Sequence, residues 1–170
     1  LVESPPEKPL IAAVEGYALA GGFEIALSCD LIISSKSSQF GVPEVKRGLV
    51  AAGGGLLRLP TQTFHRLAME LALTGDFIDS ERAYQTGLVN HVVEDGKALE
   101  AAIEMAEKIC ANGPLAVAAS KKIVNCARDW SNEEMFQQEK VLSVPILKSE
   151  DAIEGATAFA EKRAPQWKGK

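Results

Sequence analysis

Two short apolar runs on either side of a glycine-led helical segment constrain the fold of this chain more than any other feature. The runs cover residues 10–14 and 31–34, and both are typical of buried strands. Gly21 and Gly22 open the segment between them, which is apolar on nearly every side, as expected of a helix inside a fold. A strand, a glycine turn, a helix and a second strand form a crossover unit, so the sequence predicts an α/β fold.

The rest of the chain is predicted to be mainly helical. Apolar spacing and capping residues predict helices over residues 64–73, 82–85, 97–112, 115–127, 132–144 and 149–162, and one further strand over 88–93. With 170 residues, no internal repeat and no long polar linker, one domain is the economical interpretation. The C-terminal helices then pack on the α/β part or on another subunit.

Composition and charge exclude several kinds of partner. The chain has 18 basic and 23 acidic residues, a net charge of −5, and no stretch basic enough to neutralise a run of phosphates, so we expect no nucleic acid. Its apolar runs are far shorter than the roughly 20 residues that span a bilayer, so we expect no membrane partner. The cysteines Cys29, Cys110 and Cys126 show no paired spacing, which predicts a reducing compartment, the cytoplasm, with the mitochondrial matrix left open.

Several familiar catalytic signatures are missing. The glycines at 53–55 are not followed by Lys and Ser or Thr, so they do not form a phosphate-binding loop. His65 and His91 are the only histidines, and neither has Cys, Asp or Glu at metal-ligand spacing. We therefore expect no metal site, and the absence of a Gly-x-Ser-x-Gly elbow argues against a serine triad.

Two glutamates stand out as candidate acid and base groups. Glu24 lies three residues after Gly21 in a segment otherwise fit for burial, where an unpaired carboxylate is costly. Its alternative role is that of a first-turn acid favoured by the helix dipole. Glu44 follows Pro43 at a turn, and its alternative role is that of a solvated acid at a helix start. Spacing alone does not bring the two carboxylates together.

The two glutamates belong to a series of motifs that extends along the chain. The series starts with Glu15-Gly16-Tyr17-Ala18-Leu19-Ala20-Gly21-Gly22-Phe23-Glu24 and Ser28-Cys29-Asp30, and continues through Gln39-Phe40-Gly41-Val42-Pro43-Glu44, Leu73-Thr74-Gly75-Asp76, Gly87-Leu88-Val89-Asn90 and Ala158-Phe159-Ala160-Glu161-Lys162-Arg163. In order and spacing, over nearly the whole chain, these motifs resemble the enoyl-CoA hydratase (crotonase) family.

The resemblance implies a crotonase-like α/β superhelix of β-β-α units with a helical C-terminal oligomerisation region. Residues 1–110 would form the C-terminal part of the α/β core, and residues 111–170 a region for trimerisation and closure of the substrate site. The implied substrate is an acyl-CoA thioester, with no cofactor because CoA is part of the substrate. The implied assembly is a homotrimer or a dimer of trimers.

The resemblance also assigns roles to individual residues. Glu24 would orient and activate water for attack at Cβ, and Glu44 would exchange the proton at Cα, giving a 3-hydroxyacyl-CoA. Gly21 would donate a backbone N–H to the thioester oxygen, with a packing glycine as the alternative. The residues implied in substrate or CoA binding are Gly22, Ala52, Phe159 and Lys162. For Lys162, the alternative is a solvated cation at a helix end.

The sequence departs from the family pattern in three places. Ala20 replaces the first of three glycines, and Ala52 stands where a glycine is common, so that a positive φ there would be strained. No counterpart of the family's N-terminal portion precedes Leu1, so a partial domain that assembles without catalysing stays open. Isomerisation of the double bond, or other enolate chemistry, is the alternative to hydration.

Overall fold

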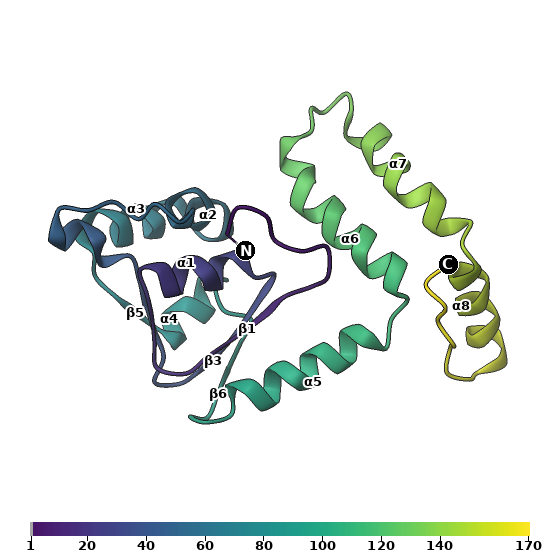
Figure 1. Cartoon of the computed structure of the whole chain (residues 1–170), viewed down its shortest axis with the longest axis horizontal. Helices are drawn as coiled ribbons and strands as arrows, with labels where there is room; N and C mark the ends of the chain where they lie inside the picture. The colour runs from purple at the N-terminus through teal and green to yellow at the C-terminus, as the bar shows by residue number, and fades with distance from the viewer. Residues whose placement is uncertain (1) are drawn as a thin grey trace. The chain divides into compact units, whose positions relative to one another are not determined.

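The computed structural model describes residues 2–170, which divide into two compact units. The first unit combines Leu10–Met105 with the N-terminal residues up to Pro6, and the second combines Glu7–Pro9 with Ala106–Lys170. The first unit contains the strands β1 to β6, and helices make up most of the second (Figure 1). No helix among the described residues is long and apolar enough to cross a bilayer.

The predicted crossover unit is present in the first unit. Strand β1 (Ile11–Val14) leads through a short strand to helix α1 (Gly21–Ser28), and α1 is followed by β3 (Leu31–Ser35). β1 and β3 pair in parallel, and β6 (His91–Val93) adds in parallel to the other side of β3. The sequence therefore predicted the central element of the fold correctly.

A second small sheet places the start of α1. Strand β2 (Tyr17–Leu19) pairs in parallel with β4 (Gln39–Gly41), and β5 (Ile78–Asp79) pairs antiparallel with β4. The carboxyl ends of β2 and β4 meet at one edge because the strands are parallel. The chain leaves that edge into α1 after β2 and into the 3-10 helix η1 (Pro43–Arg47) after β4.

Four further helices begin in the first unit: α2 (Gly55–Gln62), α3 (His65–Thr74), α4 (Ser80–Gln85) and α5 (Ala98–Cys110). Helix α1 packs against α2, and α2 packs against α3 (Figure 1). The largest fully buried side chains of the unit are Phe23, Leu27, Ile33, Phe40, Leu59 and Leu71. They come from α1, α2, α3 and both sheets, so α1 is fixed on several sides by the core.

The second unit continues with α6 (Pro114–Cys126), the 3-10 helix η2 (Ala127–Asp129), α7 (Met135–Leu147) and α8 (Glu150–Glu161). Helix α6 packs against α7, and α7 contacts α8. None of the described side chains of α6 and α7 is fully buried. Helices α6 and α7 thus leave much of their surface uncovered.

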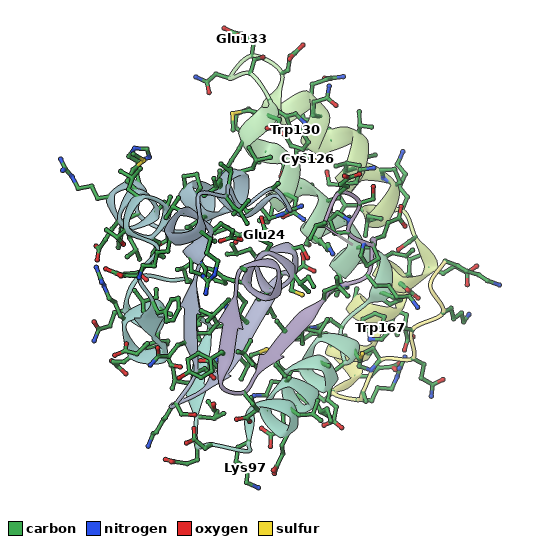
Figure 2. The ribbon with its side chains drawn as sticks, turned by 60° about the vertical axis from the view of Figure 1, so that its left-hand side comes forward. Glu24, Lys97, Cys126, Trp130, Glu133 and Trp167 are labelled. Atoms are coloured by element: carbon green, nitrogen blue, oxygen red, sulfur yellow. The ribbon has the colours of Figure 1, made fainter. Side chains whose placement is uncertain are left out.

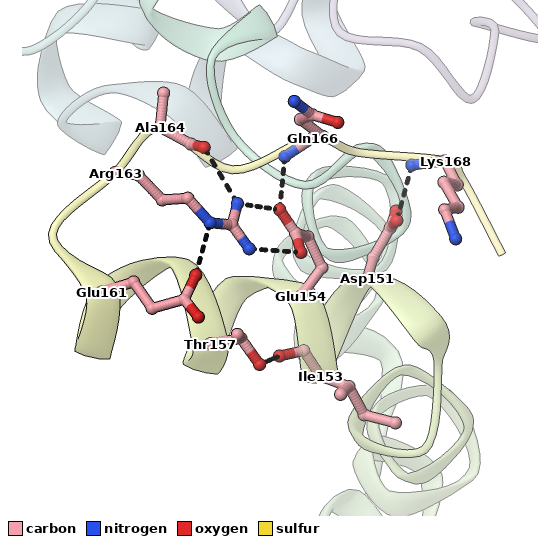
Figure 3. Close-up of polar contacts among 9 residues, drawn as sticks. All are labelled: Asp151, Ile153, Glu154, Thr157, Glu161, Arg163, Ala164, Gln166 and Lys168. Atoms are coloured by element: carbon pink, nitrogen blue, oxygen red, sulfur yellow. Dashed lines mark hydrogen bonds and ion pairs between the residues drawn. The ribbon is translucent and has the colours of Figure 1, made fainter.

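The C-terminal tail, residues 163–170, is held against α8 by two carboxylates (Figure 3). The carboxylate of Asp151 accepts the backbone N–H groups of Lys168 at 2.7 Å and Gly169 at 2.9 Å. Glu154 accepts two hydrogen bonds from the Arg163 guanidinium, at 2.6 and 3.0 Å. This guanidinium, followed by the backbone N–H of Gln166, lowers the pKa of Glu154 to about 2, so the pair is ionised at neutral pH.

Two predicted elements begin three residues later in the structure than expected. The strand predicted over residues 88–93 is limited to His91–Val93, because the backbone N–H groups of Leu88 and Val89 bond Ala83 at the end of α4. The helix predicted over 132–144 runs over Met135–Leu147, because Ser131 and Glu134 form the turn that precedes it.

Ala20, the residue before α1, has a strained backbone. Its φ of 50° and ψ of −128° lie in a region that glycine adopts freely and alanine rarely does. The strain that the sequence led us to expect at Ala52 is not there, because Ala52 does not have a positive φ. It lies at Ala20, which also replaces a family glycine.

We expect Ala20→Gly to stabilise the protein. Relief of the strained φ outweighs the larger entropy of glycine in the unfolded chain, for a net gain of about 1 kcal/mol. The melting temperature should rise by about 2–4 °C. Thermal unfolding of the two proteins side by side measures this, and an unchanged or lower melting temperature would contradict it.

Candidate active site

Glu24 is a buried carboxylate held by backbone N–H groups from a distant loop. Its side chain projects from α1 (Figure 2), and the residue is 6% exposed. The Oε1 atom accepts hydrogen bonds from the backbone N of Gly53 at 2.7 Å and of Gly55 at 2.9 Å. Gly55 is the first residue of α2, so the carboxylate also lies at the positive end of that helix dipole. These contacts explain how the charge is buried.

The glycines at 53 and 55 are required by the closeness of Glu24. A Cβ atom on Gly53 would lie 2.5 Å from Oε2 of Glu24, and one on Gly55 would lie 2.9 Å from its Cγ. We call residues 51–55 the glycine loop. Oε1 is fully engaged by this loop, whereas Oε2 has no hydrogen bond to a described residue and can act on a substrate or a water molecule.

We expect Gly53→Ala to push the Glu24 carboxylate out of the glycine loop. The clash should cost about 1–3 kcal/mol of unfolding free energy, typical of overpacking at a tight site. A double-mutant cycle tests this: in a Glu24→Ala background the same change should cost little, because the clashing atoms are gone. Equal losses of unfolding free energy in both backgrounds would show that the side chain introduced at position 53 does not clash with Glu24.

Glu44 offers a second carboxylate with a buried, free oxygen. It lies on η1 directly after Pro43, and the residue is half-buried. Its Oε2 is buried and has no hydrogen-bond partner among the described residues. Buried polar atoms are normally paired, so a buried, unpaired carboxylate oxygen calls for an explanation. The alternative of a fully solvated acid does not agree with this burial.

The start of α1 provides free backbone donors. Gly21 and Gly22 are the first two residues of the helix, where backbone N–H groups have no intrahelical acceptor. Both are exposed, and a Cβ atom on either would meet no described atom within 4 Å. Close packing against the described part of the chain therefore does not account for Gly21.

The fold brings these groups to the same region of the first unit. The backbone N of Ala20, just before α1, donates to the carbonyl of Gly41 at 3.0 Å, three residues before Glu44. Glu24 lies one turn into α1 and contacts the glycine loop, which follows η1 in the chain. Glu24 and the glycine loop are thus in contact, and the turn that carries Glu44 follows a strand bonded to the residue before α1. These groups make up the candidate site.

The remaining predicted binding residues lie in different places. Ala52 is in the glycine loop, next to Gly53, and is exposed. Phe159 and Lys162 belong to the second unit, where Phe159 is 88% exposed on α8 and Lys162 follows the helix with a φ of 54°. The first unit therefore contains Ala52 together with the glutamates, and it does not contain Phe159 or Lys162.

Sequence reasoning missed the donors of the glycine loop. The sequence excludes a phosphate-binding loop at 53–55 and, by resemblance, implicates Ala52, but it does not predict that Gly53 and Gly55 bond Glu24, because Gly53 is 29 positions further along the chain. The glycine run itself was the signal that could have found them. Among residues 2–170 no three His, Cys, Asp or Glu side chains gather as a metal site would require.

Comparison with known proteins identifies the fold and the family. The enoyl-CoA hydratase/isomerase family model matches residues 4–170. An enoyl-CoA hydratase from Mycobacterium tuberculosis H37Rv superposes with a TM-score of 0.99 at 60% identity, over 99% of this chain and 67% of that chain. One from Mycobacterium marinum superposes with a TM-score of 0.98 at 61% identity, over the same shares. The fold is therefore that of the crotonases.

Curated relatives of the chain are named carnitinyl-CoA dehydratases. A carnitinyl-CoA dehydratase from Salmonella arizonae is 45% identical over 166 residues, which are 95% of this chain and 64% of the relative. A carnitinyl-CoA dehydratase from Proteus mirabilis is 42% identical over 167 residues, with 96% and 64% covered. The chain thus spans slightly less than two thirds of these relatives. Because the family model matches residues 4–170, which are almost the whole chain, the chain belongs to the enoyl-CoA hydratase/isomerase family.

Proposed function

We propose that the protein is an enoyl-CoA hydratase, which adds water to a trans-2-enoyl-CoA to give a 3-hydroxyacyl-CoA. The observation that carries this proposal is the pair of carboxylates, Glu24 and Glu44. Each has one oxygen, Oε2, without a hydrogen bond to a described residue. Addition of water to a double bond needs one group that takes a proton and one that gives a proton, and two such carboxylates supply both.

Glu24 acts on the water in the proposed mechanism. Its Oε1 is held by the glycine loop, so Oε2 is aimed in a fixed direction. Oε2 accepts a proton from the water as the water oxygen bonds to Cβ. Glu44 delivers the proton that bonds to Cα, and the elements of water are thereby added across the former double bond.

The start of α1 stabilises the charge that develops during this addition. As oxygen bonds to Cβ, electron density moves from the double bond toward the thioester oxygen. The N–H of Gly21 lies at a helix N-terminus, where donor and dipole both favour negative charge. Such a fixed donor is typically worth about 3–4 kcal/mol in the transition state.

The proposed reaction forms one C–O bond at Cβ and one C–H bond at Cα by proton transfer, with negative charge held on the thioester oxygen and no net oxidation or reduction. We therefore expect no cofactor, since CoA is part of the substrate. Gly22 and Ala52 are proposed to contact the acyl part, beside Gly21 and the glycine loop. Phe159 and Lys162 are proposed to contact CoA, where the Lys162 ammonium would meet phosphate.

Loss of water is the second candidate activity, and the curated relatives favour it. They are named carnitinyl-CoA dehydratases, at up to 45% identity. The same two carboxylates would serve elimination in reverse, with Glu44 removing the proton at Cα and Glu24 protonating the departing hydroxyl. Isomerisation of the double bond, which the family name includes, would use a single proton-transferring carboxylate.

A homotrimer, or a dimer of trimers, is the proposed assembly. Its support is the exposed apolar surface of the second unit, where Phe136, Leu147, Ile153 and Phe159 are 66–88% exposed. The sequence predicts that the C-terminal helices pack on the α/β part or on another subunit, and Ile153 and Phe159 are not buried by their own unit. A monomer at micromolar concentration in light scattering would refute the assembly.

A panel of CoA thioesters tests the proposed activity. It contains 2-enoyl-CoA, 3-enoyl-CoA and 3-hydroxyacyl-CoA substrates, and the products are identified by mass. Hydration of the 2-enoyl-CoA is the expected main activity. Conversion of 3-enoyl-CoA to its 2-enoyl isomer without net hydration would favour isomerisation, and turnover of none would favour a non-catalytic domain.

A further inference from the structure

The segment after α3 contacts the turn that carries Glu44 on both of its sides. We call Gly75, Asp76 and Phe77 the bracket. On the side before Glu44, a Cβ atom on Gly41 would lie 2.7 Å from Cδ1 of Phe77 and 3.0 Å from the carbonyl oxygen of Asp76. Gly41 is buried, so the bracket backbone and ring pack closely against the end of β4.

On the side after Glu44, the bracket contacts Lys46 and Val45. The Lys46 ammonium lies 2.6 Å from Oδ1 of Asp76 and 5.8 Å from the ring centroid of Phe77. A Cβ atom on Gly75, whose φ is +65°, would lie 3.1 Å from both Lys46 Cγ and Val45 Cγ2. Three consecutive residues thus enclose the turn from Gly41 to Lys46.

The turn needs such external support. A five-residue 3-10 helix has weak internal hydrogen bonds, so its orientation depends on what packs against it. The ion pair of Lys46 and Asp76 is nearly half to two-thirds exposed, and exposed pairs contribute little to the free energy of unfolding. The hydrogen bond and charge of Lys46 lower the pKa of Asp76, so the Asp76 carboxylate is ionised at neutral pH. The ion pair therefore contributes to the orientation of the turn more than to the free energy of unfolding.

We propose that the bracket positions Glu44, so that Gly75, Asp76 and Phe77 are positioning residues for proton transfer at Cα. This inference rests on the proposed function of Glu44. None of the three residues needs to touch the substrate. They act by fixing the turn before and after Glu44, and a displacement of about 1 Å at a reacting group can cost up to roughly 100-fold in rate.

Charge reversal at Asp76 is the central test, made in the full chain. Asp76→Lys places two ammonium groups together and should move Lys46 and the turn. We expect kcat for hydration to fall roughly tenfold, with KM and the melting temperature nearly unchanged. The double variant Lys46→Asp with Asp76→Lys restores an ion pair of opposite direction and should recover most of the lost kcat.

A partial reaction separates positioning from general damage. Exchange of the Cα protons of a saturated acyl-CoA with D2O uses the step assigned to Glu44 and no addition of water. This exchange should fall in parallel with kcat in Asp76→Lys. Glu94→Lys is the matched control, because it disrupts another exposed ion pair of the first unit, the one between Lys36 and Glu94, which involves no residue of the bracket or of the turn from Gly41 to Lys46. It should leave both rates unchanged.

The outcomes are distinguishable. Wild-type kcat and exchange in a folded Asp76→Lys variant, or an equal loss in Glu94→Lys, would overturn the bracket while leaving the hydratase proposal intact. Full activity of Glu44→Gln would instead overturn the proposed function. If Asp76→Lys lowers the melting temperature, Asp76→Asn carries the test, because it removes the charge without adding repulsion. Wild-type exchange in Asp76→Asn would then overturn the bracket.

Discussion

Replacing Glu24 by glutamine is expected to lower kcat for hydration by about 10²- to 10⁴-fold and to leave the fold unchanged. The amide oxygen of glutamine can still accept the N–H groups of Gly53 and Gly55. The loss falls on the other atom, because an NH₂ group in place of Oε2 cannot take a proton from water. Steady-state kinetics with a 2-enoyl-CoA and thermal unfolding of the same preparation measure the two effects.

Glu44→Gln is the parallel variant and should lose activity over the same range. The two variants differ in the exchange of Cα protons with D2O, which should be lost in Glu44→Gln and largely kept in Glu24→Gln. Near-normal hydration by either folded variant would rule out the two-carboxylate mechanism. An unfolded Glu24→Gln protein would show instead that the charge itself is needed by the glycine loop.

Gly21→Pro is expected to lower kcat by roughly 10²- to 10³-fold, the usual effect of deleting one donor to a developing oxyanion. Proline removes the backbone N–H, and the first helical position is the one where a helix tolerates it best. The melting temperature should therefore change far less than the turnover. CoA-thioester turnover per folded molecule, measured beside thermal unfolding, tests this.

Gly21→Ala and Gly21→Val separate the loss of the donor from crowding. Both keep the N–H, and their Cβ atoms would meet no described atom. We expect stable proteins in which turnover falls as the side chain grows, because it obstructs the approach of the thioester. A fully active Gly21→Val enzyme would remove Gly21 from the site. Loss of stability with unchanged activity per folded molecule would make it a packing glycine.

The sequence predicted the parts of the fold that have strong local signals. The crossover from β1 through α1 to β3 follows from two apolar runs and a glycine pair, and it is confirmed. Strands of two or three residues, such as β2 and β5, are too short to show an alternating pattern, and they were not predicted. Helix α7 extends past Pro145 because only its last turn loses a hydrogen bond there.

The site was predictable to a lesser degree. Glu24 was noticeable because a charged residue in a buried helix is unusual, and its burial is confirmed. Its partners Gly53 and Gly55 were not predictable from spacing, because the contact depends on how α1 packs against α2. The same holds for Lys46 and Asp76, which are 30 residues apart in the chain. The catalytic role of Glu24 and the positioning role of Asp76 stay predictions.

The proposed hydration of a 2-enoyl-CoA depends on both Glu24 and Glu44. It is tested by incubation of the wild type and of both glutamine variants with a trans-2-enoyl-CoA in D2O, followed by mass spectrometry of the product. We expect a 3-hydroxyacyl-CoA with one deuterium at Cα from the wild type, and almost none from either variant. A wild type that forms no such product, or variants that form it at the wild-type rate, would contradict it.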